Sequence, residues 1–122
     1  MRFLPTRVHG VIDYVYSLAL LASPWLFGYS RGGAETWVPV SLGIFGILYS
    51  VFTDYELGLV RILPMRLHLL IDMAFGVFLT ASPWLFGFAE QVRVPHVVFG
   101  LLAILTPMAT QTRPSPAVQA RS

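Results

Sequence analysis

The sequence contains no cysteine and no lysine, and only 11% of its 122 residues are charged. Without cysteine, the chain cannot form disulfides, use a catalytic thiol or bind a metal through sulfur. Its basic residues are eight arginines, which are scattered singly and form no patch of the kind that binds nucleic acid. An ordinary soluble domain has about 25% charged residues. The scarcity of charge therefore argues against a water-soluble enzyme.

Apolar residues are correspondingly abundant: 56% of the chain is hydrophobic, and the mean hydropathy is +0.70. A helix needs ~20 mostly apolar residues to cross the hydrocarbon layer of a membrane. Four stretches meet this requirement: Thr6–Phe27, Thr36–Thr53, Met65–Phe86 and Val94–Gln111. The connections between them are short, so consecutive helices should be antiparallel neighbours. The sequence predicts an all-α membrane protein, a left-handed four-helix transmembrane bundle.

An internal repeat divides the chain into two helical hairpins. At a shift of 59 residues, Leu4–Gly28 lies over Leu63–Gly87 with 14 identities in 25 positions. The second and fourth spans match at a shift of 57, which pairs Gly43 with Gly100. We therefore expect one two-helix unit at residues 1–58 and a second at 59–111, followed by a disordered cytoplasmic tail at 112–122.

The orientation of the two units follows from their span number and from the arginines. Each unit has two spans, so both should insert with the same orientation, as parallel repeats about an axis along the membrane normal. Six arginines lie in the two termini and the middle connection, and two lie in the other connections. The positive-inside rule then places both termini in the cytoplasm. Because its near copy is internal, the first span is expected to be structural and not a cleaved signal peptide.

A Ser-Pro-Trp motif closes the first helix of each unit. Its residues are Ser23, Pro24 and Trp25 in the first unit and Ser82, Pro83 and Trp84 in the second. With two such copies, the chain resembles the SPW-repeat family of small bacterial integral membrane proteins over both units. The resemblance implies a four-span protein of the bacterial inner membrane, and it implies no catalytic residues.

The chemistry of the Ser-Pro-Trp residues is that of a helix exit at the membrane interface. Proline should kink or end the helix, and serine can return a hydrogen bond to the preceding turn. Tryptophan suits the outer membrane interface. Gly28 and Gly87 allow the left-handed turn that closes a helix. A ligand or partner site on the outer face is the alternative interpretation.

The second repeated motif is Arg-x-His-x-x-x-Asp. It comprises Arg7, His9 and Asp13 in the first unit and Arg66, His68 and Asp72 in the second. Histidine and aspartate four residues apart share a helix face, which continues to the small residues Ser17 and Gly76. This face should therefore point into the bundle, with each aspartate ~10 Å inside the helix start. A carboxylate at that depth requires a partner.

Three interpretations of this polar intramembrane site remain open. In the structural one, Asp13 pairs with His9 and Arg66, while Asp72 pairs with His68 and Arg7. In the second, the His–Asp pairs form a proton-linked site for an ion or small ligand. In the third, His9 and His68 are axial ligands of a haem. His96 has no counterpart in the first unit and is expected to lie at the interface.

These observations favour a non-enzymatic accessory, scaffold or interaction protein. Its expected partners are the lipid bilayer and either a second copy of itself or another membrane protein, with no nucleic acid. No cofactor and no metal are expected under this interpretation. Proton-linked transport or sensing of an ion or small ligand, or haem binding, is the alternative.

Overall fold

The computed structural model describes residues 3–112 and shows four helices. They are α1 (Thr6–Leu26), α2 (Ala34–Val51), α3 (Met65–Leu85) and α4 (Val94–Ala109). Each begins and ends within two residues of the expected span. Over the described residues, β pairing is limited to two isolated bridges. The prediction of a disordered tail falls almost wholly on residues 113–122, which lie outside the described residues.

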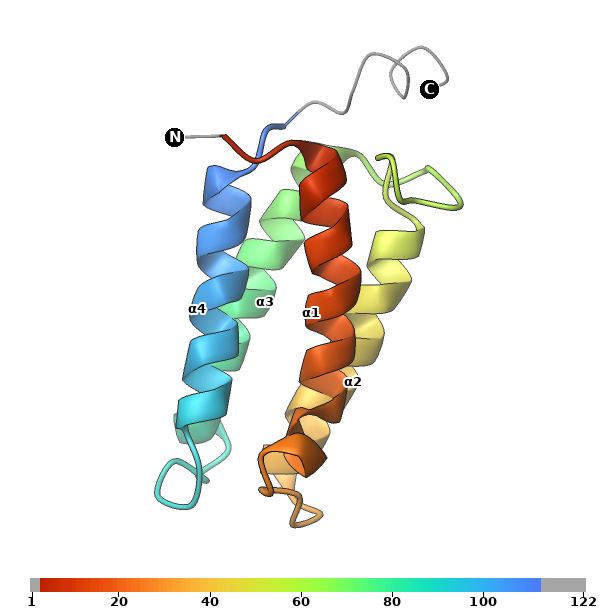
Figure 1. The fold of residues 1–122 in the computed structure, drawn as a ribbon. Helices are drawn as coiled ribbons and strands as arrows, with labels where there is room; N and C mark the ends of the chain where they lie inside the picture. The colour runs from red at the N-terminus through yellow and green to blue at the C-terminus, as the bar shows by residue number, and fades with distance from the viewer. Residues whose placement is uncertain (1–2, 113–122) are drawn as a thin grey trace.

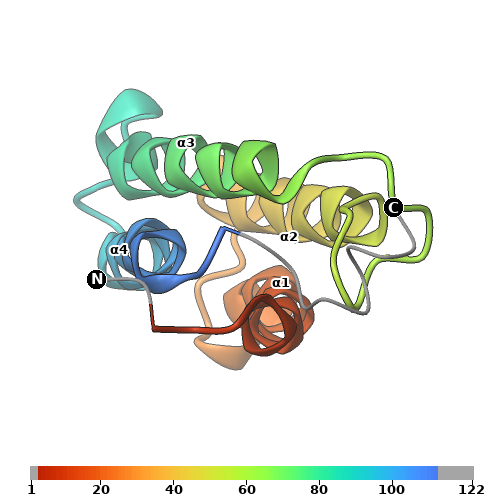
Figure 2. The same ribbon diagram turned by 90° about the horizontal axis from the view of Figure 1, so that it is seen from above.

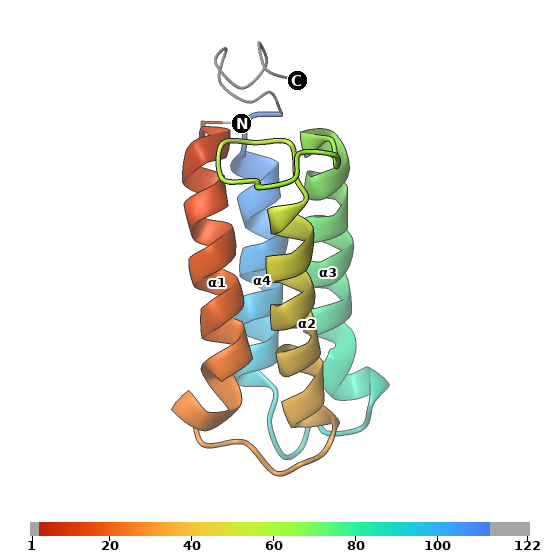
Figure 3. The ribbon, with the colours of Figure 1, turned by 90° about the vertical axis from the view of Figure 1, so that its right-hand side faces the viewer.

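The helices form two hairpins that stand side by side (Figure 1). Helix α1 packs along α2, and α3 packs along α4, while α2 with α3 and α1 with α4 make smaller contacts. The order around the bundle is thus α1, α2, α3, α4, with α1 and α3 across from each other (Figure 2). Helices α1 and α3 both begin at the end where Leu4, Thr110 and the connection 52–64 lie (Figure 3). We call this the terminal end.

Small residues allow the two helices of each hairpin to approach closely. A Cβ atom added to Gly43 of α2 would lie 2.8 Å from the carbonyl oxygen of Ser17 in α1. A Cβ atom added to Gly100 of α4 would lie 2.6 Å from the backbone nitrogen of Thr80 in α3. The paired glycines of the repeat therefore serve equivalent contacts, one within each hairpin.

Polar residues occupy the interior of the bundle, and large apolar residues cover much of its outside. The interior contains both repeated histidines, both repeated aspartates and several hydroxyl side chains: His9, Asp13, Ser17, Ser23, Ser50, Thr53, His68, Asp72 and Ser82. The exposed apolar side chains include Val15, Leu18, Phe45, Leu48, Leu70, Val77, Phe78, Leu101 and Leu105. A smaller apolar core, Leu20, Val38, Phe75 and Leu79, lies between the hairpins. This distribution is the reverse of a soluble bundle's.

Two of the helices, α2 and α3, are long and apolar enough to cross a membrane. Helix α4 is a shorter apolar helix of 16 residues. Length and composition alone are thus compatible with a membrane location and do not fix the number of spans.

Candidate functional site

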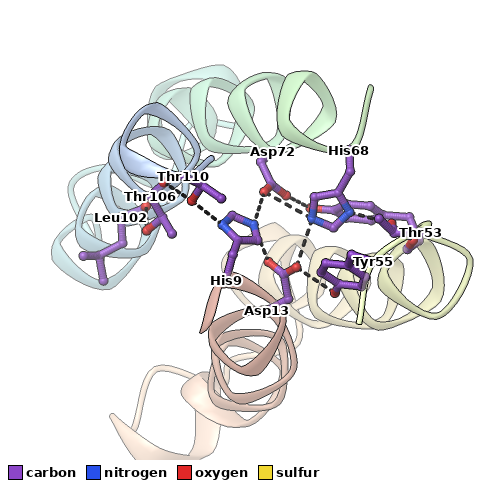
Figure 4. Close-up of polar contacts among 10 residues, drawn as sticks. His9, Asp13, Thr53, Tyr55, His68, Asp72, Leu102, Thr106 and Thr110 are labelled. Carbon is purple, nitrogen blue, oxygen red and sulfur yellow. Dashed lines mark hydrogen bonds and ion pairs between the residues drawn. The ribbon is translucent and has the colours of Figure 1, made fainter. Parts of the chain in front are cut away.

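The two repeated histidines and the two repeated aspartates meet at one point near the terminal end of the bundle (Figure 4). His9 and Asp13 come from α1, and His68 and Asp72 come from α3. All four are buried. We call these four residues the His–Asp cluster. Both aspartates therefore face the interior of the bundle, within reach of a histidine.

Histidines and aspartates alternate around the cluster, so that each histidine contacts both carboxylates. His9 Nε2 lies 3.0 Å from Asp13 Oδ1 and 2.9 Å from Asp72 Oδ2. His68 Nε2 lies 2.9 Å from Asp13 Oδ2 and 3.4 Å from Asp72 Oδ2. Two of these contacts lie within a unit and two join the units. The cluster is therefore shared between the two units.

A tyrosine hydroxyl donates a hydrogen bond to each carboxylate. Tyr55, in the connection 52–64, donates to Asp13 Oδ2 over 2.9 Å, and Tyr49 of α2 donates to Asp72 Oδ1. Burial and the neighbouring Asp13 raise the pKa of Tyr55, so its hydroxyl stays protonated and remains a donor. Each carboxylate thus accepts a hydrogen bond from a tyrosine in addition to its contacts with the histidines.

Two threonines each accept a hydrogen bond from a histidine. The Thr53 hydroxyl donates to the Tyr49 carbonyl over 2.6 Å, and the Thr110 hydroxyl donates to the Thr106 carbonyl over 2.7 Å. A hydroxyl has a single proton. Each threonine therefore accepts from a histidine: His68 Nδ1–H donates to Thr53 over 2.6 Å and His9 Nδ1–H donates to Thr110 over 2.8 Å. The Nε2 atoms are thereby directed at the carboxylates.

Backbone bridges hold these threonines in place. Leu4 N donates to Ala109 O and Gln111 N donates to Leu4 O, which bridges Leu4 to Thr110. An equivalent bridge joins Leu63 to Thr53. Leu4 lies just before α1, which carries His9, and its bridge partner Thr110 contacts His9. Leu63 and Thr53 have the same relation to α3 and His68. The equivalence of Thr53 and Thr110 is visible in the sequence, because the shift of 57 residues pairs them.

Both arginines of the repeated motif lie outside the cluster. Arg7 and Arg66 are exposed, and the ion pairs of Asp13 and Asp72 in the described residues go to the histidines. The arginine pairing expected in the structural interpretation is thus wrong. Arg7 is two residues from His9, a rotation of ~200° around the helix, which turns its side chain away from the cluster.

The space at the cluster is small. A cavity of about 20 Å³ lies among residues of all four helices, and its lining includes His9, Asp13, Asp72 and Tyr49. Such a volume holds one water molecule or one ion. The two imidazole rings are in edge contact, with centroids 5.4 Å apart. No macrocycle fits between them, which argues against the haem interpretation.

The Ser-Pro-Trp residues form two equivalent helix exits at the opposite end, which we call the SPW end. Helices α1 and α3 end two residues after Pro24 and Pro83. Proline cannot donate to the carbonyl four residues earlier, and here serine replaces that donor. Ser23 donates to Leu20 O over 2.7 Å, and the second unit repeats the bond from Ser82 to Leu79 O. This explains why serine precedes proline in both copies.

The outer residues of the two exits are exposed tryptophans and glycines in left-handed turns. Trp25 and Trp84 are 63% and 60% exposed. Gly28 and Gly87 have φ values of 71° and 73°, in the left-handed region. The exit geometry therefore agrees with the helix-exit interpretation in each unit separately.

His96 is a buried contact between the units, which differs from its expected interfacial place. Its Nε2–H donates to the Glu35 carbonyl over 2.9 Å. Its ring packs against Tyr29 of the first unit and Phe88 of the second. His96 occurs in a single copy without a repeat signal, so this role could not be recognised from the sequence.

Comparisons with known proteins identify one family. The model of the SPW repeat domain matches residues 7–110. Neither the curated proteins nor the solved structures contain a significant match to the chain.

Proposed function

From the premise that the chain belongs to the SPW repeat family, we propose that it is a non-enzymatic integral membrane protein, a scaffold or interaction subunit. In this proposal the four helices cross the bacterial inner membrane, the two hairpins have the same orientation, and the terminal end faces the cytoplasm. The polar interior and apolar exterior of the bundle carry the proposal.

This distribution of side chains matches a lipid environment. Ionisable residues in a membrane face the bundle interior and pair with one another, as His9, His68, Asp13 and Asp72 do. The exposed apolar residues on α1 to α4 would contact acyl chains. The exposed Trp25 and Trp84 suit the opposite, outer interface. Arg7 and Arg66, exposed at the terminal end, would reach the inner headgroups.

The closed form of the His–Asp cluster supports a scaffold over an enzyme or an organic-solute transporter. Its cavity of about 20 Å³ has no room for an organic substrate. Most of its polar contacts join a residue of one unit to a residue of the other. The cluster therefore gives the hairpins one relative position, which is the use best attested for buried ionic groups.

The absence of cysteine makes the topology straightforward to test. Single cysteines replace Arg31, Glu90 or Leu59, all exposed residues in connections, and intact cells are treated with a membrane-impermeant maleimide. We expect labelling of the Arg31→Cys and Glu90→Cys variants, and labelling of Leu59→Cys only after permeabilisation. Labelling of Leu59→Cys in intact cells would contradict the orientation.

Native mass measurement of the purified protein tests the scaffold role. We expect a second copy of the chain or a defined membrane-protein partner to remain bound after gentle detergent extraction. A chain that is monomeric and free of partners at every detergent concentration would contradict the role.

A further inference from the structure

The four groups at the centre of the His–Asp cluster have the arrangement of a ligand set for one cation. Each residue offers one nitrogen or oxygen, and these atoms all lie within 4.8 Å of one another. Asp72 Oδ2 lies 2.9 Å from His9 Nε2 and 3.4 Å from His68 Nε2, whereas Asp13 contacts the two histidines through different oxygens, Oδ1 at 3.0 Å and Oδ2 at 2.9 Å. A tetrahedron with metal–ligand bonds of ~2.0–2.1 Å has edges of about 3.3 Å. The separations around Asp72 Oδ2 are close to these edges, and Asp13 would complete the set through one of its two oxygens.

One nitrogen of the cluster points into this centre without a hydrogen bond. His68 is fully buried, and its Nε2 atom makes no hydrogen bond even though two carboxylate oxygens lie 2.9 and 3.4 Å away. The contacts have ion-pair distances but lack the direction of a hydrogen bond. A fully buried nitrogen that lies this close to two carboxylate oxygens and hydrogen-bonds to neither has the surroundings of a metal ligand.

The threonines hold the histidine rings in the orientation that ligation requires. A histidine that binds a metal through Nε2 commonly donates its Nδ1–H to an oxygen, which orients the ring and raises its basicity. His9 and His68 each do this, to Thr110 and Thr53. Both threonines are buried at 0% exposure, and both come from the unit opposite their histidine.

Charge and ligand type select the cation. Binding releases the Nε2 protons of both histidines, and the neutral imidazoles then leave the two carboxylates with a total charge of −2, which a divalent cation balances and a monovalent cation does not. Two nitrogen and two oxygen ligands suit Zn²⁺ and similar transition metals better than Ca²⁺ or Mg²⁺, which prefer oxygen ligands in greater number. The adjoining cavity of about 20 Å³ leaves room for a single ion or water and nothing larger.

We propose that His9, Asp13, His68 and Asp72 bind one divalent transition-metal cation of the Zn²⁺ class between the two repeat units, with Thr53 and Thr110 orienting the two histidines. The site goes beyond a scaffold role and stands independently of it, because metal binding is measured on the isolated protein whatever its topology or partners.

The experiment uses the full chain in detergent micelles, purified through a tag that contains no histidine and stripped with a chelator. Equilibrium dialysis against ZnCl₂, followed by elemental analysis, gives the stoichiometry. We expect one Zn²⁺ per chain. Co²⁺ offered in place of Zn²⁺ should give the intense visible absorption of a four-coordinate site. A wild-type protein that binds no Zn²⁺ would overturn the proposal.

Three variants locate the site. Asp72→Asn should lose the stoichiometric Zn²⁺, whereas His96→Gln, which removes the buried histidine at the other end of the bundle, should retain it. Thr53→Val keeps all four ligands, so it tests the site even if Asp72→Asn fails to fold; we expect ~10–100-fold weaker Zn²⁺ binding. Unchanged affinity in both Asp72→Asn and Thr53→Val, or loss of binding in His96→Gln alone, would overturn the assignment.

Discussion

The two ends of the bundle use a repeated motif in opposite ways. At the terminal end, the two copies of the His–Asp motif meet, so that each histidine contacts a carboxylate and a threonine of the other unit. At the SPW end, each copy of the Ser-Pro-Trp motif acts within its own helix, where serine donates to a carbonyl of the preceding turn. Duplication of one hairpin thus produced one site that needs both copies and another that occurs twice.

Removal of one carboxylate should have the largest effect on stability. In Asp72→Asn, His9 and His68 lose a charged partner while both remain buried. We expect the free energy of unfolding in micelles to fall by ~3–5 kcal/mol, the cost of breaking a buried ion pair. Denaturation followed by circular dichroism measures it. Glu90→Gln, at an exposed position of a connection at the SPW end, is the control and should change stability little. A loss of stability equal to the control's would show that the cluster does not join the units.

Loss of a threonine hydroxyl at the terminal end should have an intermediate effect. Thr53→Val preserves the shape of the side chain but leaves the buried Nδ1–H of His68 without an acceptor. An unsatisfied buried donor costs ~1–3 kcal/mol. The same denaturation assay should show equal losses for Thr53→Val and Thr110→Val, because the two threonines are equivalent. A large effect at only one of them would break the equivalence of the two copies.

Loss of a serine hydroxyl at the SPW end should cost less. In Ser23→Ala, the Leu20 carbonyl loses the donor that replaces the missing N–H of Pro24. We expect a decrease of ~1 kcal/mol, typical of one neutral hydrogen bond. Because the exit is a local structure, hydrogen exchange should increase near residue 23 while the amides around Ser82 stay protected. Increased exchange at both exits would show that they are coupled.

The smallest effect is expected for the arginines of the repeated motif. Arg66 is exposed and lies outside the cluster, so Arg66→Gln should change the free energy of unfolding by less than about 0.5 kcal/mol. The arginine pairing expected from the sequence would instead require an effect comparable to that of Asp72→Asn. The denaturation midpoints of the two variants, measured side by side, separate these interpretations.

The sequence predicted local structure well because each local signal occurs twice. The helix ends and the helix exits at Pro24 and Pro83 follow from repeated residues with known backbone effects. The sequence also placed Asp13 and Asp72 in the interior, since a carboxylate at that depth needs a partner.

The partners across the bundle were harder to predict, because they depend on the rotation and depth of each helix. Arginine was expected as the counter-charge on formal charge alone, although the angular position of Arg7 relative to His9 already argued against it. Thr53 and Thr110 were overlooked because a hydroxyl at a helix end is common and carries no charge. His96 occurs once, so the repeat could not reveal it.

Double-mutant cycles test most directly the claim that the His–Asp motif acts between the units and the Ser-Pro-Trp motif within them. One cycle combines His9→Gln with Asp72→Asn, and the other combines Ser23→Ala with Ser82→Ala, with the free energy of unfolding measured in micelles for each variant. We predict a coupling energy of ~1–3 kcal/mol for the first pair and additivity within ~0.5 kcal/mol for the second. Additive effects at His9 and Asp72, or coupling between the two serines, would contradict the account.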